Sequence, residues 1–299
     1  MTTLVSQRPS PPPPPRGLLA GFGPAYAWGL RLALGRPLRM LVVLGVAAAL
    51  GALTGWFSVH GGSGARAGDG EAAFQLWEGL KEALLPSAVP LAALVLVAGA
   101  FSREVSERTL VFHLVRPIAR RTLYLARFSA AVTVAIPVAL VPPLVALGVA
   151  GLPLPASTAW ALVPPVVLGV LAFGAITCLL GAWFRRGIIA GLVYVFLVDG
   201  FMSEASGTMQ RLSLVHHVLS LFHRGVDADF GALSERVRSS SEAAPASINP
   251  GDLISQVLSS ERVDWMQPWS AALVLLAVTA VALALGAGRV SSRDYPLKD

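Results

Sequence analysis

Long uncharged stretches separated by short polar segments dominate the pattern of the 299-residue chain. Residues 40–59 and 83–102 contain no charged side chain. A helix of about twenty apolar residues is long enough to cross the hydrocarbon core of a bilayer, which is about 30 Å thick. Each of these two stretches therefore predicts a membrane-spanning helix.

The uncharged stretch over residues 128–184 is too long for a single crossing. It is interrupted by the sequence Gly151–Thr158, whose glycine and prolines are typical of a turn. We therefore expect two spans, over 128–150 and 159–184, joined by this turn. Prolines also occur inside both predicted spans, and a helix bundle tolerates them where neighbouring groups satisfy the freed carbonyls.

Two further apolar stretches complete an all-α integral membrane fold with six predicted spans. The stretch over 187–202 is shorter and carries one carboxylate, Asp199, which we expect at the level of the outer head groups. The stretch over 265–288 is a full-length span. Residues 21–299 are thus predicted to form one transmembrane domain, preceded by a disordered, proline-rich tail over residues 1–20.

The segment before the first span has the spacing of a short amphipathic helix. Its apolar face is formed by Phe22, Tyr26, Gly29, Leu30 and Ala33. Three arginines and a tryptophan lie close by, which is typical of a helix on the inner membrane surface. An N-terminal extension of the first span is the alternative.

Composition and charge fit a membrane protein and indicate its orientation. The chain is 55% hydrophobic and 13% charged, whereas about a quarter of the residues of an ordinary soluble domain are charged. With six spans and a cytoplasmic N-terminus, sixteen of the 23 Lys and Arg residues lie on the cytoplasmic side. Since positive charge favours that side, both termini are predicted to be cytoplasmic. The net charge of +6 then reports orientation rather than nucleic-acid binding.

The cytoplasmic loop over residues 103–127 holds six arginines and two glutamates between two spans. Glu104 and Arg108 have the i,i+4 spacing that stabilises a helix. Pro117 disfavours helix at Arg116 and would end it there. The loop therefore predicts a short helix, a break and a basic segment leading into the next span. An ordinary basic loop that only fixes the topology is the alternative interpretation.

The external loop over residues 203–264 is predicted to contain amphipathic helices. Leu212, Val215, Val218 and Phe222 would share one apolar face, which suits a helix at the outer interface. His216 and His223 are seven residues apart and are the only candidates for a metal site. Polar-face histidines of an interfacial helix explain them with fewer assumptions.

Motifs for catalysis or cofactor binding are absent from the sequence. It has no phosphate-binding loop ending in Gly-Lys-Ser/Thr, no His-Glu-x-x-His and no Gly-x-Ser-x-Gly. Its one cysteine, Cys178, lies within a predicted span and excludes a disulfide framework or a cysteine-based metal site. We therefore expect no enzymatic activity and no cofactor in this chain.

The run from Glu104 to Arg127 resembles the cytoplasmic signature of permease subunits of exporter-type (ABC-2 type) ATP-binding cassette transporters. The family pattern has acidic residues, Gly-Thr-Leu, a leucine, then Pro and Arg, with Lys before the next span. The matching residues are Glu104, Thr109, Leu110, Leu114, Pro117 and Arg120. Arg108 replaces the usual glycine and Arg127 the usual lysine. The segment Leu-Val-Arg-Pro over residues 114–117 most resembles the branch of the family linked to copper-enzyme maturation and gliding.

This resemblance implies a permease of the bacterial inner membrane, dimeric with itself or with a second permease. It also implies a separate cytoplasmic ATPase as partner, which would bind the ATP and Mg²⁺. The residues implied to contact that ATPase are Glu104, Glu107, Arg108, Thr109, Arg116, Pro117, Arg120 and Arg121. A membrane scaffold that moves no solute is the main alternative. An ATP-independent channel and an intramembrane enzyme are the others.

Overall fold

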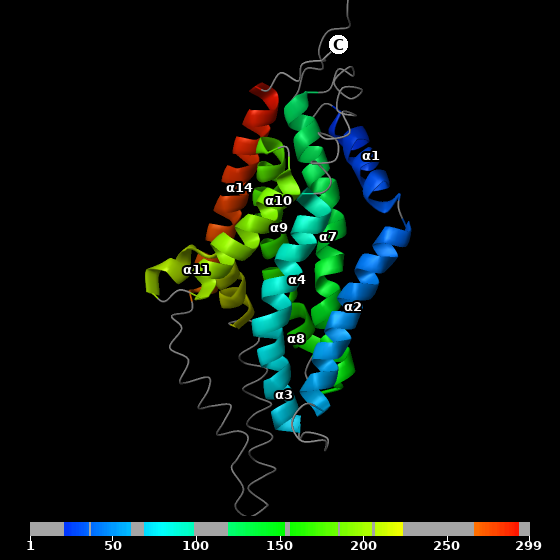
Figure 1. The fold of residues 1–299 in the computed structure, drawn as a ribbon, viewed down its shortest axis with the longest axis vertical. Coiled ribbons are helices and arrows are strands. Elements are labelled where there is room, and N and C mark those ends of the chain that lie inside the picture. Colours follow the sequence, from blue (N-terminus) through cyan, green and yellow to red (C-terminus); the bar gives the residue numbers. More distant parts are fainter. Residues whose placement is uncertain are drawn as a thin grey trace, which may run out of the picture.

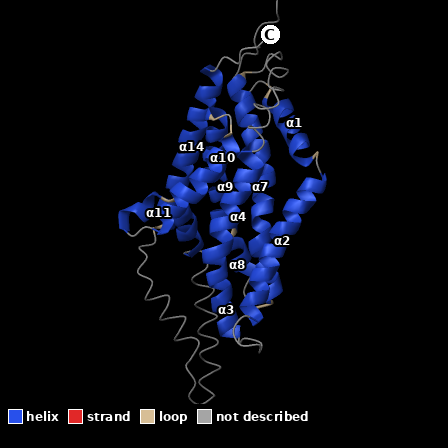
Figure 2. Cartoon of the chain, in the orientation of Figure 1, coloured by secondary structure: helices blue, strands red, loops and turns tan. Residues whose placement is uncertain are grey.

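The computed structural model describes residues 21–35, 37–60, 69–98, 119–152, 156–184, 186–204, 207–223 and 266–292. Almost all of these residues are helical and none of them lies in a strand (Figure 1 and Figure 2). The helices run mainly along the long axis of one elongated bundle. The prediction of an all-α membrane protein is therefore confirmed.

The described helical elements follow one another in chain order. In order they are α1 (Phe22–Leu34), α2 (Pro37–His60), α3 (Asp69–Glu78), η1 (Gly79–Leu84), α4 (Leu85–Ala92), η2 (Ala93–Ala98), α7 (Arg120–Ala150), α8 (Ala156–Ala161), α9 (Val163–Trp183), α10 (Gly187–Val193), η3 (Tyr194–Asp199), α11 (Gly200–Glu204), η4 (Gly207–Leu212) and α14 (Pro268–Ser292). A further helix covers Leu214–His223. Of these, η1, η2 and η3 are π-helical turns and η4 is a 3₁₀ turn.

Five helical stretches within the described residues are long and apolar enough to cross a membrane. They are Met40–His60, Gln75–Ala98, Arg120–Ala150, Thr158–Trp183 and Pro268–Ser292. Each corresponds to one of the six predicted spans. The other predicted span, over 187–202, falls on the shorter apolar helix Gly187–Ser203. A sixth full crossing therefore stays a prediction.

Two of the helices begin well before the predicted spans. The second apolar stretch is helical from Gln75 rather than from residue 83, and the third from Arg120 rather than from residue 128. The predicted boundaries follow the charged side chains. Long charged side chains near a helix end can reach the polar interface while their backbone stays helical. Span boundaries drawn at the last charged residue therefore lie too far inside these two helices.

Helix α7 is the central element of the bundle and packs against α1, α2, α9 and α14. It continues as one helix through Pro137, Pro142 and Pro143. Pro142 and Pro143 are buried among the neighbouring helices, where a missing backbone donor is tolerated.

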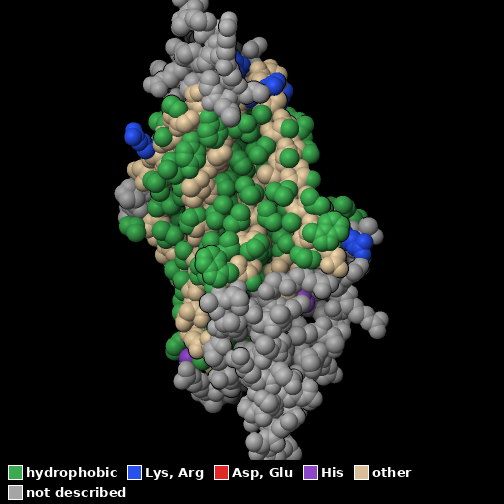
Figure 3. Space-filling view, turned by 180° about the vertical axis from the view of Figure 1, so that it is seen from behind, with side chains coloured by type: hydrophobic (Ala, Val, Ile, Leu, Met, Phe, Trp, Pro, Cys, Tyr) green, Lys and Arg blue, Asp and Glu red, His purple; other side chains and the backbone are tan. Residues whose placement is uncertain are grey.

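The described surface of the bundle is apolar. Figure 3 shows hydrophobic side chains over most of the bundle, with Lys and Arg confined to a few places.

Helices α2 and α7 approach each other closely at two glycines of α2. A Cβ atom at Gly51 would overlap the carbonyl oxygen of Pro142, and one at Gly55 would overlap that of Ala146. The spacing Gly-x-x-x-Gly allows the two backbones this contact. A Cβ atom at Gly45, by contrast, would meet no atom within 4 Å, so this glycine is not needed for the packing of α2 against α7.

Candidate functional site

The end of the bundle at which α7 begins and α14 ends is the end predicted to face an ATPase (Figure 1). Arg120 and Arg121 form the first turn of α7, with Arg120 half-buried and Arg121 exposed. Ala119, the residue before the helix, has an extended backbone conformation. The other predicted contact residues lie outside the described residues: Glu104, Glu107, Arg108, Thr109, Arg116 and Pro117.

Arg127 was assigned to the cytoplasmic loop by its charge, but the structure places it inside α7. Its side chain is only 3% exposed. The guanidinium carbon lies 3.4 Å from the centroid of the Trp28 ring of α1. Arginine stacks readily on aromatic faces, because its planar cation is attracted by the negative face of the ring and is weakly hydrated. Arg127 therefore joins two helices of the permease domain rather than facing a partner.

The contact between α1 and α7 is not limited to this stacked pair. Ala25 packs against Leu123 and Ala126, and the hydroxyls of Tyr26 and Thr133 share a hydrogen bond of 3.0 Å. The predicted apolar face of α1 is thus correct, but much of it contacts α7. Helix α1 is also not an extension of the first span, because it ends at Leu34 and α2 starts in a new direction at Pro37 (Figure 1).

Asp199, the residue before α11, fixes the start of the helix Leu214–His223. Its carboxylate accepts hydrogen bonds from the backbone N–H groups of Leu214 at 2.6 Å and Val215 at 3.3 Å. The Ser213 hydroxyl accepts a third from the N–H of His216 at 3.4 Å. These groups satisfy donors that a helix start leaves unpaired. Asp199 is 2% exposed, so its carboxylate is held by the protein itself, and its predicted level at the outer head groups stays a prediction.

The helix Leu214–His223 is buried on nearly all sides instead of lying on the interface with one polar face. His216 and His217 are each 2% exposed. The His217 ring nitrogen Nδ1 lies 2.7 Å from the carbonyl oxygen of Ser213, and the His223 ring packs edge-on against Trp77. The interpretation of these histidines as solvated polar-face residues is therefore wrong. No group of three or more His, Cys, Asp or Glu side chains suited to a metal occurs in the described part of the chain.

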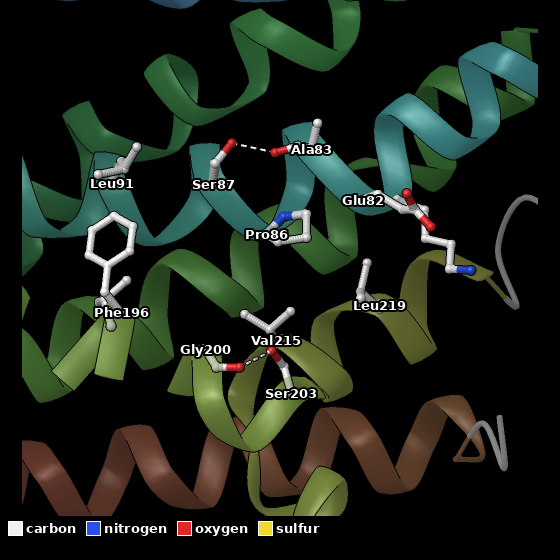
Figure 4. Close-up of a pocket in the computed structure, with 12 residues that line it drawn as sticks. Glu82, Ala83, Pro86, Ser87, Leu91, Phe196, Gly200, Ser203, Val215 and Leu219 are labelled. Atoms are coloured by element: carbon white, nitrogen blue, oxygen red, sulfur yellow. Dashed lines mark hydrogen bonds between the residues drawn. The ribbon is translucent and has the colours of Figure 1, made fainter. Parts of the chain in front are cut away.

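A groove of about 500 Å³ lies between the second apolar stretch, the η3–α11 segment and the helix Leu214–His223 (Figure 4). We call it the side groove. Glu82 of η1 lies at one end, and Leu91 of α4 and Phe196 of η3 lie at the other. Lys81, the neighbour of Glu82 in the chain, also lines the groove. Between the two ends are Ser87, Ser203 and apolar side chains. Nothing in the sequence pattern predicted this groove, because it depends on how far η3 and α11 stand from α4.

The sequence profile of one protein family, described as ABC-2 family transporter protein, matches residues 68–295. The chain belongs to this family. It is accordingly a multi-pass membrane protein and a transporter permease, as the resemblance of the loop over 103–127 suggested. The matched range covers every described helix from α3 to α14 and leaves α1 and α2 outside. No curated protein matches the chain.

Proposed function

We propose that this ABC-2 permease is the membrane-spanning subunit of an exporter and that a separate cytoplasmic ATPase drives it. The observation that carries the proposal is the family membership of a chain without a phosphate-binding loop. Nucleotide hydrolysis needs such a loop or its equivalent to hold the phosphates. A transporter whose permease lacks this phosphate-binding loop therefore needs a partner protein that contains it.

The arrangement at the start of α7 supports the proposal that the ATPase contacts the basic loop over residues 103–127. Residues 99–119 lie between η2 and α7 in the chain, so a force on this loop would act on the first turn of the central helix. The stacked pair of Arg127 and Trp28 joins that part of α7 to α1. A shift of the loop would therefore move α1 and α7 together, as in two-state coupling across an interface.

The proposal also includes the orientation and the assembly. Both termini would be cytoplasmic in the bacterial inner membrane, with the starts of α1 and α7 and the end of α14 on the ATPase side. Two permease copies, identical or different, would pair with two ATPase copies. The positive-inside charge distribution supports this orientation, and the family resemblance supports the assembly.

Purification of the tagged chain in mild detergent tests the proposal. We expect an ATP-binding cassette ATPase to co-purify, and the complex to hydrolyse ATP. Replacing the catalytic glutamate of that ATPase should abolish the activity, while the permease alone should have none. Recovery of the chain with periplasmic or membrane enzymes and no ATPase would favour the scaffold function instead.

A further inference from the structure

The side groove has a charged end and an apolar end, which is the pattern of an amphiphile site. Lys81 and Glu82 are the last charged residues before the uncharged stretch that begins at Ala83. Leu91, ten residues after Lys81 in the same helical stretch, lies beside Phe196 at the other end (Figure 4). At about 1.5 Å per residue, the groove follows this stretch for roughly 15 Å.

The position of the groove in the bundle gives it access to lipid. Phe196 on its rim is 59% exposed, and its neighbours Leu197 and Phe201 are also exposed. Large apolar side chains exposed on a membrane-spanning bundle face the lipid. Lys81 and Glu82 lie near the start of the helical stretch Gln75–Ala98, where long charged side chains can reach the level of the head groups. An occupant can enter from the bilayer with its head at this end.

The charges at the mouth define the kind of head group. Lys81 is 8% exposed, and its ammonium lies 4.9 Å from the centroid of the Trp77 ring, which fixes a cation at this end. Glu82 is exposed and places a carboxylate beside it. A purely anionic head would meet the carboxylate, and a purely cationic head would meet the ammonium. A head with both a phosphate and an ammonium complements both.

We propose that the side groove binds one zwitterionic glycerophospholipid from the adjacent leaflet. Its phosphate lies at Lys81, its ammonium at Glu82, and an acyl chain extends between Pro86, Leu91 and Phe196. The volume of about 500 Å³ is within the range of about 300–1,000 Å³ that is typical of ligand sites. Two π-helical turns, η1 and η3, supply residues of two of the three walls, and such turns are frequent at functional sites. The assignment of this leaflet to the outer side rests on the proposed function.

Native mass spectrometry of the full chain in detergent tests this site with phosphatidylethanolamine and phosphatidylglycerol as probes. We expect the wild-type chain to retain one phosphatidylethanolamine in preference to phosphatidylglycerol. The Glu82→Lys variant should reverse this preference, with a change of about fivefold in each affinity, the upper range for an exposed ion pair. Glu82 is exposed, so this variant is not expected to disturb packing. A reversal of preference is also a result that misfolding does not produce.

A groove-filling variant and a matched control complete the experiment. Ser87→Phe should abolish the single tight adduct, whereas Leu273→Phe, at an exposed position of α14, should leave it unchanged. Equal retention of both lipids, or a preference that Glu82→Lys leaves unaltered, would overturn the proposal. If Glu82→Lys changes the dimer fraction but not the lipid adducts, the groove is a contact between copies and the proposal is wrong. Since no ATPase is present, either result leaves the proposed function to be judged separately.

Discussion

The carboxylate of Asp199 and the backbone of Leu214, fifteen residues apart, are joined by a hydrogen bond of 2.6 Å. This bond ties the end of η3 to the start of the helix Leu214–His223. The short apolar stretch Gly187–Ser203 and the helix Leu214–His223 therefore form one unit. That unit provides two of the three walls of the side groove.

Replacement of Asp199 by Leu should loosen the start of the helix Leu214–His223. Loss of a cap costs about 1–2 kcal/mol, and about 1.4 kcal/mol corresponds to a tenfold change in an opening equilibrium. We expect the amides of Leu214 and Val215 to exchange about tenfold faster with deuterium. Ser203→Ala removes only a local bond to the carbonyl of Gly200 and should leave this exchange unchanged. Wild-type protection in Asp199→Leu would show that the cap contributes nothing.

The stack of Arg127 on Trp28 should stabilise the docking of α1. A double-mutant cycle of Trp28→Leu and Arg127→Met, followed by thermal unfolding in detergent, isolates the pair from its other contacts. The expected coupling energy is about 1–2 kcal/mol, since the cation is largely removed from water. The exposed Trp160 serves as a control, because Trp160→Leu should show no coupling with Arg127→Met. Strictly additive effects at Trp28 and Arg127 would contradict the stabilising role.

The close contact of α2 with α7 predicts different effects for two glycines of the same helix. Gly51→Ala should destabilise the bundle by about 1–3 kcal/mol, because its Cβ meets the backbone of α7. Gly45→Ala should be neutral or slightly stabilising, because its Cβ meets open space. Thermal unfolding of the two variants measures the difference. Equal melting temperatures would mean that α2 does not pack on α7 at Gly51.

The orientation can be tested by labelling cysteines introduced at exposed positions of a Cys178→Ala chain in whole cells. Arg211→Cys in η4 should react with a membrane-impermeant maleimide added from outside. Arg121→Cys at the start of α7 and Ser292→Cys at the end of α14 should react only after permeabilisation. These two positions lie at the same end of the bundle (Figure 1), so they must behave alike. Labelling of Arg121→Cys from outside would overturn the proposed orientation.

The fold class could be predicted from the sequence because uncharged length is a direct requirement of the bilayer. Five spans follow from this pattern alone. The helix ends were less accurate, since Arg127 carries the charge of a loop residue and yet is buried against Trp28. The sequence shows that Arg127 is charged, but it does not show that an aromatic ring of another helix stacks on its side chain. The burial of α1 against α7 was missed for the same reason.

The region that follows residue 199 was predicted least well, because its helix is positioned by tertiary contacts. The apolar face through Val215, Val218 and Phe222 was recognised by its spacing. The position of this helix depends on the cap from Asp199, on the contact of His223 with Trp77 of α3 and on the packing of Val218 against α9. A carboxylate near the end of an apolar stretch could have indicated a cap. Its partners lie fifteen residues further along the chain, which no local pattern specifies.

The central claim is that the start of α7 transmits the action of a separate ATPase, and the measurement that tests it most directly is ATPase stimulation in vesicles. The permease and the co-purified ATPase are reconstituted with wild-type, Arg121→Glu or Arg211→Glu permease. Arg121 is exposed at the proposed ATPase end and Arg211 is exposed in η4, so the two substitutions alter the same charge at different places. Arg121→Glu should reduce the stimulated ATPase rate or the binding of the ATPase several-fold, and Arg211→Glu should change neither. If Arg121→Glu and Glu104→Lys both retain wild-type binding and stimulation, the loop only fixes the topology and the coupling account is wrong.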